Sequence, residues 1–168
     1  MTLPTRNEHP YEIWGPIVAG FVSNILLYIL GALILKDNSI VDITWGIMFV
    51  IPNIVVLIMN ANFTETSIAS NIMLVIWALR MAVYNIMRHK DEDWRFKDMR
   101  TEWEKKGKYF PYIASYLFVY MPQSIFEIII GSSDLFITIW STPGYTPLLP
   151  IGIAIWAFGF IIEVVADF

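Results

Sequence analysis

Long apolar runs separated by short polar segments make up most of the chain. The first run, Ile13 to Leu35, contains no charged residue. As a helix it would reach about 35 Å, enough to cross a bilayer core of roughly 30 Å. Four further runs follow, and none has a continuous polar face of the kind that a soluble helix shows to water. The pattern predicts five membrane spans, near residues 13–35, 40–59, 67–87, 110–130 and 148–168.

The segment between the last two predicted spans is harder to assign. Residues 135–140 are apolar but too short to span a bilayer, and residues 141–150 contain three prolines and one glycine. We therefore interpret the stretch after Gly131 as an interfacial or re-entrant loop. The expected fold class is all-α: a polytopic transmembrane helical bundle that forms one membrane domain over residues 1–168.

The basic residues gather in one loop, which predicts how the chain lies in the membrane. Eight of the eleven Lys and Arg fall in the charged loop 88–109, which is short enough for the positive-inside rule to apply. We expect this loop, the turn at 36–39 and the C-terminus to face the cytosol or the mitochondrial matrix. The mixed charges of residues 91–106 are also typical of a solvated helix on the membrane surface.

Composition excludes several other classes of function. Hydrophobic residues are 57% of the chain and charged residues 15%, whereas soluble domains carry about 25% charged residues. The formal net charge of −4 argues against nucleic acid as a partner, because binding phosphates needs a broad basic face. The absence of Cys excludes disulfides and zinc–thiolate sites. The adjacent acids 91–93 lack the spacing of a calcium loop, so we expect no metal site.

A few ionisable residues fall inside the predicted spans, where they normally turn inward and pair. Arg80, in the last third of the third span, needs an anion, and three carboxylates are available at a similar depth: Asp42, Glu163 and Asp167. The group is either a polar pocket at the inner membrane surface or a structural ion pair that locks helices together. Snorkelling of Arg80 to the lipid headgroups is a further alternative.

A second intramembrane acid lies in the fourth span. Glu127 follows Gln123 by one helical turn; it can be proton-active or can hydrogen-bond a neighbouring helix, and the hydrogen bond is the expectation that we favour. No nucleophile elbow, Gly-rich phosphate loop or HExxH motif is present. We therefore expect no catalytic residue.

Four groups of residues recur in an order that is specific as a set. They are Asp42-Ile43-Thr44-Trp45-Gly46; Trp77-Ala78-Leu79-Arg80; Arg88 followed by Glu92-Asp93-Trp94-Arg95-Phe96; and a late group with Gly159-Phe160, Glu163 and Ala166-Asp167. This set resembles the steroid 5-alpha-reductase-like membrane proteins, in particular a branch known as a domain of unknown function. The resemblance covers roughly residues 42–167.

The resemblance implies a reaction, hydride transfer from NADPH to an activated double bond, and two departures bear on it. Phe96 stands where the branch has Tyr, which removes a phenol. The sequence also stops after Asp167, where the family continues into further helices and an Arg-His-Pro-Asn-Tyr segment associated with NADPH binding. We therefore expect a non-catalytic scaffold or accessory subunit of a larger membrane complex, such as a respiratory complex, with no cofactor.

The alternative is the N-terminal part of an NADPH-dependent membrane reductase of enone-type lipid or steroid substrates. Besides lipid, the expected partners are other membrane subunits. A respiratory subunit would lie in the mitochondrial inner membrane and a reductase in the endoplasmic reticulum. In either case the candidate polar cluster comprises Asp42, Arg80, Arg88, Glu163 and Asp167.

Overall fold

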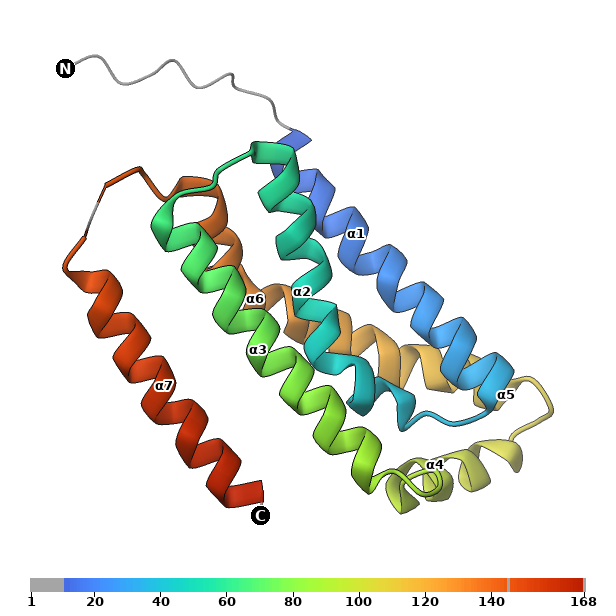
Figure 1. The fold of residues 1–168 in the computed structure, drawn as a ribbon. Helices are drawn as coiled ribbons and strands as arrows, with labels where there is room; N and C mark the ends of the chain where they lie inside the picture. Colours follow the sequence, from blue (N-terminus) through green and yellow to red (C-terminus); the bar gives the residue numbers. More distant parts are fainter. Residues whose placement is uncertain (1–10, 145, 168) are drawn as a thin grey trace.

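The structure, a computed structural model, describes residues 11–144 and 146–167, and within them it is helical with no strand (Figure 1). Five helical segments are long and apolar enough to cross a membrane, at Trp14–Leu35, Ile40–Asn60, Glu65–Arg88, Phe110–Trp140 and Leu148–Asp167. The predicted fold class, an all-α bundle with five spans, is confirmed. The chain is an integral membrane protein.

Helix α2 (Ile40–Asn60) lies at the centre and packs against α1 (Tyr11–Tyr28), α3 (Glu65–Arg88) and α6 (Met121–Trp140). Its closest approach to α3 is at Gly46. A Cβ atom added to Gly46 would lie 2.8 Å from the Cα atom of Ala78. The absence of a side chain at Gly46 therefore sets the separation of α2 and α3.

The ends of the first two spans are formed by residues in the left-handed conformation. The π-helical segment η1 (Ile29–Leu35) continues α1 and ends at Lys36, whose φ is 55°. Helix α2 ends at Ala61, with φ 46°. Helix α3 then begins with a side-chain cap, because the hydroxyl of Thr64 accepts a hydrogen bond from the Ser67 N–H at 3.2 Å.

The fourth span is longer than the sequence predicts. Helix α5 (Phe110–Ser115), the π-helical segment η2 (Tyr116–Tyr120) and α6 form one continuous helical segment that ends at Trp140, so the re-entrant loop that we expected after Gly131 is absent from this stretch. The polar residues there do not break the helix. The hydroxyls of Ser132 and Ser133 donate back to the carbonyls of Ile129 and Ile130, at 2.7 and 3.4 Å.

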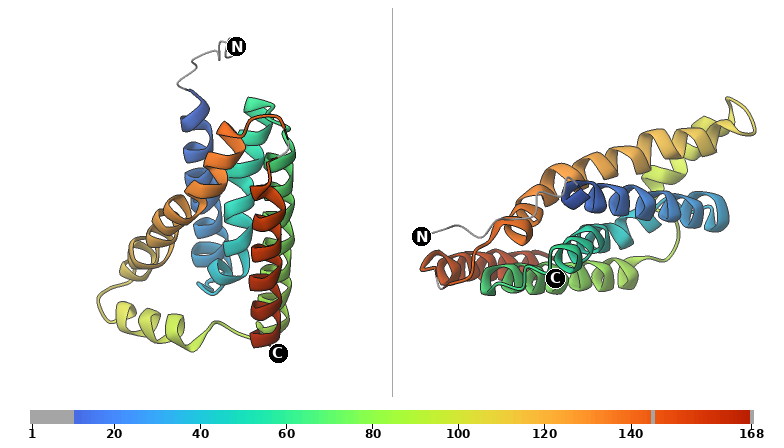
Figure 2. Two further views of the ribbon diagram at one scale, coloured as in Figure 1. Left: turned by 90° about the vertical axis from the view of Figure 1, so that its left-hand side faces the viewer. Right: turned by 90° about the horizontal axis from the view of Figure 1, so that it is seen from above.

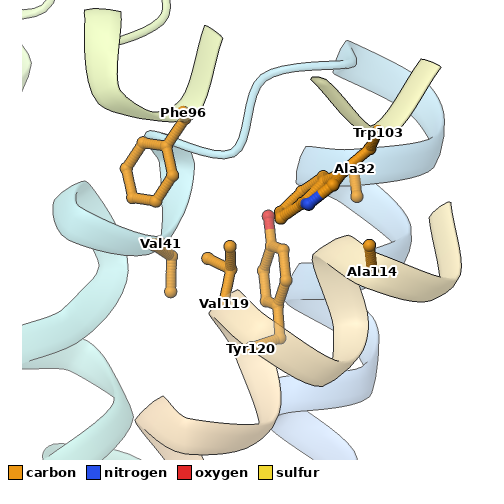
Figure 3. Close-up of a cluster of buried hydrophobic side chains, with 7 residues drawn as sticks. All are labelled: Ala32, Val41, Phe96, Trp103, Ala114, Val119 and Tyr120. Atoms are coloured by element: carbon orange, nitrogen blue, oxygen red, sulfur yellow. The ribbon is translucent and has the colours of Figure 1, made fainter. Parts of the chain in front are cut away.

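A short helix closes one end of the bundle. Helix α4 (Trp94–Glu104) lies across the ends of the spanning helices (Figure 2), within the charged loop where a surface helix was expected. Phe96 and Trp103 of α4 pack into a cluster around the fully buried Tyr120 (Figure 3). This cluster attaches the loop to α5 and η2 and fixes the charged side chains of the loop relative to the spans.

Helix α7 (Leu148–Asp167) is the least packed element. It runs beside α3 (Figures 1 and 2), and none of its described residues is buried. Its contacts are concentrated at the end where the charged side chains lie. The candidate site is at this contact.

Candidate functional site

An ion-pair cluster joins α3 to α7. The guanidinium of Arg80 donates to the carboxylates of Glu163 and Asp167, one from each terminal nitrogen. It also donates to the Glu163 carbonyl at 3.2 Å. The Arg80 side chain is 16% exposed, against 36% for Glu163 and 27% for Asp167. The arginine is therefore enclosed, and the two acids remain partly open beside it.

Aromatic side chains one turn to either side of Arg80 hold the same acids. Trp77 donates from Nε1 to Glu163 Oε2 at 3.2 Å, and the Tyr84 hydroxyl donates to the Asp167 carbonyl at 3.3 Å. The guanidinium carbon of Arg80 also lies 5.7 Å from the centre of the Tyr84 ring. The shared helix face of Trp77, Arg80 and Tyr84 is thus the surface of α3 that contacts α7.

Asp42 does not join this cluster. Its carboxylate lies 3.5 Å from the Arg95 guanidinium, and its carbonyl accepts from Asn85 at 2.9 Å. Depth alone placed Asp42 near Arg80, but the first turn of α2 faces α4 and the charged loop. The predicted cluster therefore divides into two groups.

The second group surrounds the start of α4. Asp93 caps this helix by accepting from the Arg95 N–H at 2.9 Å, and its carboxylate also accepts from the Arg95 guanidinium at 3.0 Å. These hydrogen bonds lower the pKa of Asp93 and raise the pKa of Arg95 from their usual values. Asp93 and Arg95 are thus both held in their charged forms.

Arg88 lies between the two groups. It donates to the Tyr84 hydroxyl, and its guanidinium carbon lies 5.1 Å from the centre of the Tyr84 ring. Arg88 also lines a cavity of about 360 Å³ with Asp42, Asp93 and Arg95. Tyr84 thus contacts both Arg80 and Arg88.

A cavity separates the rest of α7 from the bundle. It has a volume of about 350 Å³ and lies among α2, α3, α6 and α7. Trp77, Trp156 and Phe160 give it an aromatic lining, and Glu163 and Asp134 place carboxylates on it. An amphiphile with a flat apolar body and a hydrogen-bond donor matches this combination of side chains.

Several polar residues of the membrane interior form hydrogen bonds between helices that were not predicted from the sequence. Ser70 of α3 donates to Asp134 of α6. Asn71 donates to the Thr138 hydroxyl at 2.9 Å, and Thr138 donates in turn to Asn53 at 3.4 Å. The spacing of Asp134 and Thr138, one helical turn apart, indicates a shared polar face of a helix. This indication was missed because their segment was interpreted as a loop.

Glu127 is buried and faces α1. A Cβ atom added to Gly20 would lie 3.3 Å from its Oε1 atom, and Glu127 itself is 5% exposed. Among the described residues its carboxyl forms no hydrogen bond, whereas the sequence favoured a bond between helices. The described residues also contain no cluster of three or more His, Cys, Asp or Glu able to hold a metal.

Comparison with protein families gives a match over most of the chain. Residues 27–168 match the model of a family described as "Protein of unknown function (DUF1295)". No curated protein and no solved structure matches the chain. The matched region contains both charged groups and all of α2 to α7.

Proposed function

We propose a function for this chain, which belongs to the DUF1295 family: it is a non-catalytic accessory subunit of a larger membrane complex. In this proposal α7 is the helix against which a neighbouring subunit packs. One observation carries the proposal: no residue of α7 is buried over Leu148–Asp167, although the helix brings two carboxylates into the membrane region.

Lipid can solvate the apolar side chains of α7, but it cannot solvate its carboxylates at low cost. Glu163 and Asp167 keep part of their surface open beside Arg80. A neighbouring helix with hydrogen-bond donors at this depth would cover them. The partly covered acids therefore favour a protein neighbour over lipid alone.

Small residues on α7 support the same proposal. Gly152 and Gly159 are seven positions apart, so they lie on one face of the helix. A Cβ atom added at either position would meet no atom within 4 Å. Glycines on a membrane helix are typical of surfaces where another helix approaches closely. Because Gly159 lines the 350 Å³ cavity, a neighbouring helix would approach this face of α7 from the cavity side.

The origin of the subunit follows from the four sequence motifs. They lie at the start of α2, in α3, from the end of α3 into α4, and along α7, and as an ordered set they resemble the steroid 5-alpha-reductase-like proteins. We infer that the subunit derives from that fold. The complex that we favour is a respiratory complex of the mitochondrial inner membrane.

The resemblance implies NADPH as a cofactor, but the described residues do not form a suitable binding site for it. Two of the basic side chains around the 360 Å³ cavity have acidic partners, since Arg95 is paired with Asp93 and His89 with Asp37 at 3.0 Å; Arg88 and Lys90 also line it. Asp42, Asp91 and Asp93 add three carboxylates to the same lining. These carboxylates offset the charges of Arg88, Lys90 and Arg95, so the lining has no excess of positive charge for a diphosphate and a 2′-phosphate, and we propose no cofactor for this chain.

The test is extraction of the natural protein in mild detergent, with a photo-cross-linker placed at single cysteines. The chain has no cysteine of its own, so a cysteine at Ile155 or Val165 on α7, both highly exposed, labels one position only. Leu26 and Ile34, equally exposed on α1 and η1, serve as controls. The supporting result is one stoichiometric partner, which co-migrates with the chain and is cross-linked from α7 but not from the controls. Migration as a monomer without such a product would overturn the proposal.

A second candidate is the substrate-binding part of a membrane reductase. The observation that favours it is the aromatic cavity of about 350 Å³ with its two acids, which would enclose an enone-type lipid or steroid. The intact mass of the natural protein separates the two candidates. A mass well above 19.4 kDa, NADPH-dependent reduction of an enone and location in the endoplasmic reticulum would together favour the reductase and contradict the subunit.

A further inference from the structure

A small polar cavity lies where η1, α4 and α5 meet at the charged end of the bundle. Its volume is about 140 Å³. Lys36 directly follows the first span, and Lys108 lies two residues before the fourth, so these lining residues mark the level of the lipid headgroups. Arg100 of α4 completes a basic lining drawn from three separate segments.

The charges around this cavity are unbalanced. Arg100 is paired with Glu92. Lys36 and Lys108 form no ion pair within the part of the chain that the structure describes; the ammonium of Lys108 lies only over the Tyr109 ring, 5.8 Å from its centre. Glu104 is the single carboxylate in the lining. The cavity thus offers two ammonium groups to an anion.

Hydrogen-bonding groups form the inner part of the lining. Asn38 is 1% exposed and Ser115 is 4% exposed, and the Asn38 side chain donates to the Ser115 hydroxyl at 3.1 Å. The side-chain carbonyl of Asn38 is buried and has no donor among the described residues. A buried acceptor without a donor is costly, and a hydroxyl entering the cavity would supply one.

Apolar side chains continue from the cavity along the lipid-facing surface. Leu35 adjoins Lys36 and is 52% exposed, and Ile113 adjoins Tyr112 of the lining and is 57% exposed. Both lie at the first turn inside their spans. An anion bound between the lysines is therefore held by residues that are close in the sequence to exposed apolar residues of two spans.

We infer that this cavity binds the headgroup of an anionic phospholipid that carries hydroxyl groups, such as phosphatidylglycerol. The phosphodiester lies among Lys36, Arg100 and Lys108, and a headgroup hydroxyl faces Glu104 and Asn38. The acyl chains run down past Leu35 and Ile113. Basic pockets between helices at this face are a recurrent mode of anionic lipid binding. Soluble phosphate esters share the anion, but they have no part that would use the apolar surface.

The test measures lipid binding to the full chain by native mass spectrometry, with phosphatidylglycerol and phosphatidylcholine supplied in equal amounts. The informative variant is Lys36→Gly with Lys108→Gln. Lys36 holds a left-handed φ of 55°, which glycine adopts freely, and Lys108 is exposed, so the variant is expected to fold. The matched control, Lys90→Gln with Lys97→Gln, removes the same amount of charge from the charged loop 88–109, outside the cavity.

The wild-type protein is expected to retain phosphatidylglycerol in preference to phosphatidylcholine. Each lysine removed from the cavity lowers that preference about fivefold, and the control variant leaves it nearly unchanged. If both variants lost the preference for phosphatidylglycerol equally, the preference would be due to the overall surface charge. That result would contradict the proposed site. Displacement of the lipid by equimolar glycerol 3-phosphate would also overturn it, in favour of a soluble phosphate ester.

Discussion

Arg80 of α3 and Glu163 of α7 form an ion pair across 83 positions of the sequence. Asp167, one turn further along α7, is bound by the second terminal nitrogen of the same guanidinium. Because α7 has no buried residue, these contacts and those of Trp77 and Tyr84 attach the last span to the bundle. The ion pair therefore links the stability of the protein to the position of one helix.

Replacing Arg80 by leucine is expected to destabilise the protein by about 3 kcal/mol, because two carboxylates are left without their cation. Unfolding in detergent micelles measures the loss. Arg95→Leu is the control, since this exposed arginine is paired at the surface, and its removal is expected to cost about 1 kcal/mol or less. If Arg80→Leu left the stability unchanged, Arg80 would extend to the lipid headgroups and would not hold α7 against α3.

The contact between Gly46 and Ala78 predicts a sharp difference between two identical substitutions. Gly46→Ala places a methyl group 2.8 Å from the Ala78 Cα atom, and forcing α2 from α3 is expected to cost about 1 to 3 kcal/mol. Gly152→Ala on α7 meets no atom within 4 Å and is expected to leave stability unchanged or slightly raised. Thermal unfolding of the two variants side by side tests this, and equal effects would contradict the close approach.

The hydrogen bond from Asn71 to Thr138 predicts a modest cost for a substitution that conserves shape. Thr138→Val removes the hydroxyl that Asn71 and Asn53 share, and the expected loss is about 0.6 to 1.7 kcal/mol, as measured for hydrogen bonds between membrane helices. In the double variant with Asn71→Leu the two losses should not add, since both remove one interaction. Additive losses in unfolding experiments would show that the pair is not coupled.

The start of α4 predicts a dependence on pH. Hydrogen bonds from Arg95 lower the pKa of Asp93, so this carboxylate stabilises the folded protein above its unfolded pKa of about 4. The contribution is lost as the pH falls below that value through the folded pKa. The protection of the α4 amides against hydrogen exchange, relative to the intrinsic exchange rate at each pH, should therefore fall in acid.

Two variants of Asp93 separate its charge from its hydrogen bond. Asp93→Asn keeps a capping oxygen, so at neutral pH it should lose only the contribution of the charge, and with it the acid dependence. Asp93→Ala should also cost about 1 kcal/mol at neutral pH. If the Asp93→Asn variant still lost protection of α4 in acid, another carboxylate would be responsible for the pH dependence.

The positions of the spans could be predicted from the sequence because a bilayer demands long apolar helices and leaves few alternatives. The partner of Arg80 could not be predicted as firmly. Depth offered three carboxylates, and only the packing shows that α7 faces Trp77 and Tyr84 while Asp42 faces Arg95. The depth of a residue in the membrane follows from the sequence. The side of a helix that faces its neighbour depends on close packing contacts, such as the contact between Gly46 and Ala78.

The error after Gly131 has a related cause. The loop was expected because the apolar stretch 135–140 is too short to span a bilayer and residues 141–150 contain three prolines, so Ser132, Ser133 and Asp134 were placed outside the span. Within a bundle, Ser132 and Ser133 bond to their own helix, and Asp134 accepts from Ser70. The partner of Asp134 lies 64 positions away, beyond the reach of any local pattern, and so the polar contacts of α6 were missed.

The π-helical segment η2, Tyr116–Tyr120, fixes the angular register of everything that follows it. Glu127, Gly131 and Asp134 share one face of α6, and that face is turned into the bundle. A π-helical turn holds one residue more than an α-helical turn, so deleting one residue from η2 would restore a regular α-helix and leave all three facing the bundle. Each residue of an α-helix turns the chain by about 100°, so deleting one residue from the α-helical part between η2 and Glu127 would rotate all three toward the bilayer. A single-residue deletion just after η2 would thus expose two acids to lipid at once, whereas the same deletion within η2 would be absorbed, and this makes η2 the one place in the fourth span where the length of the chain can change by a residue.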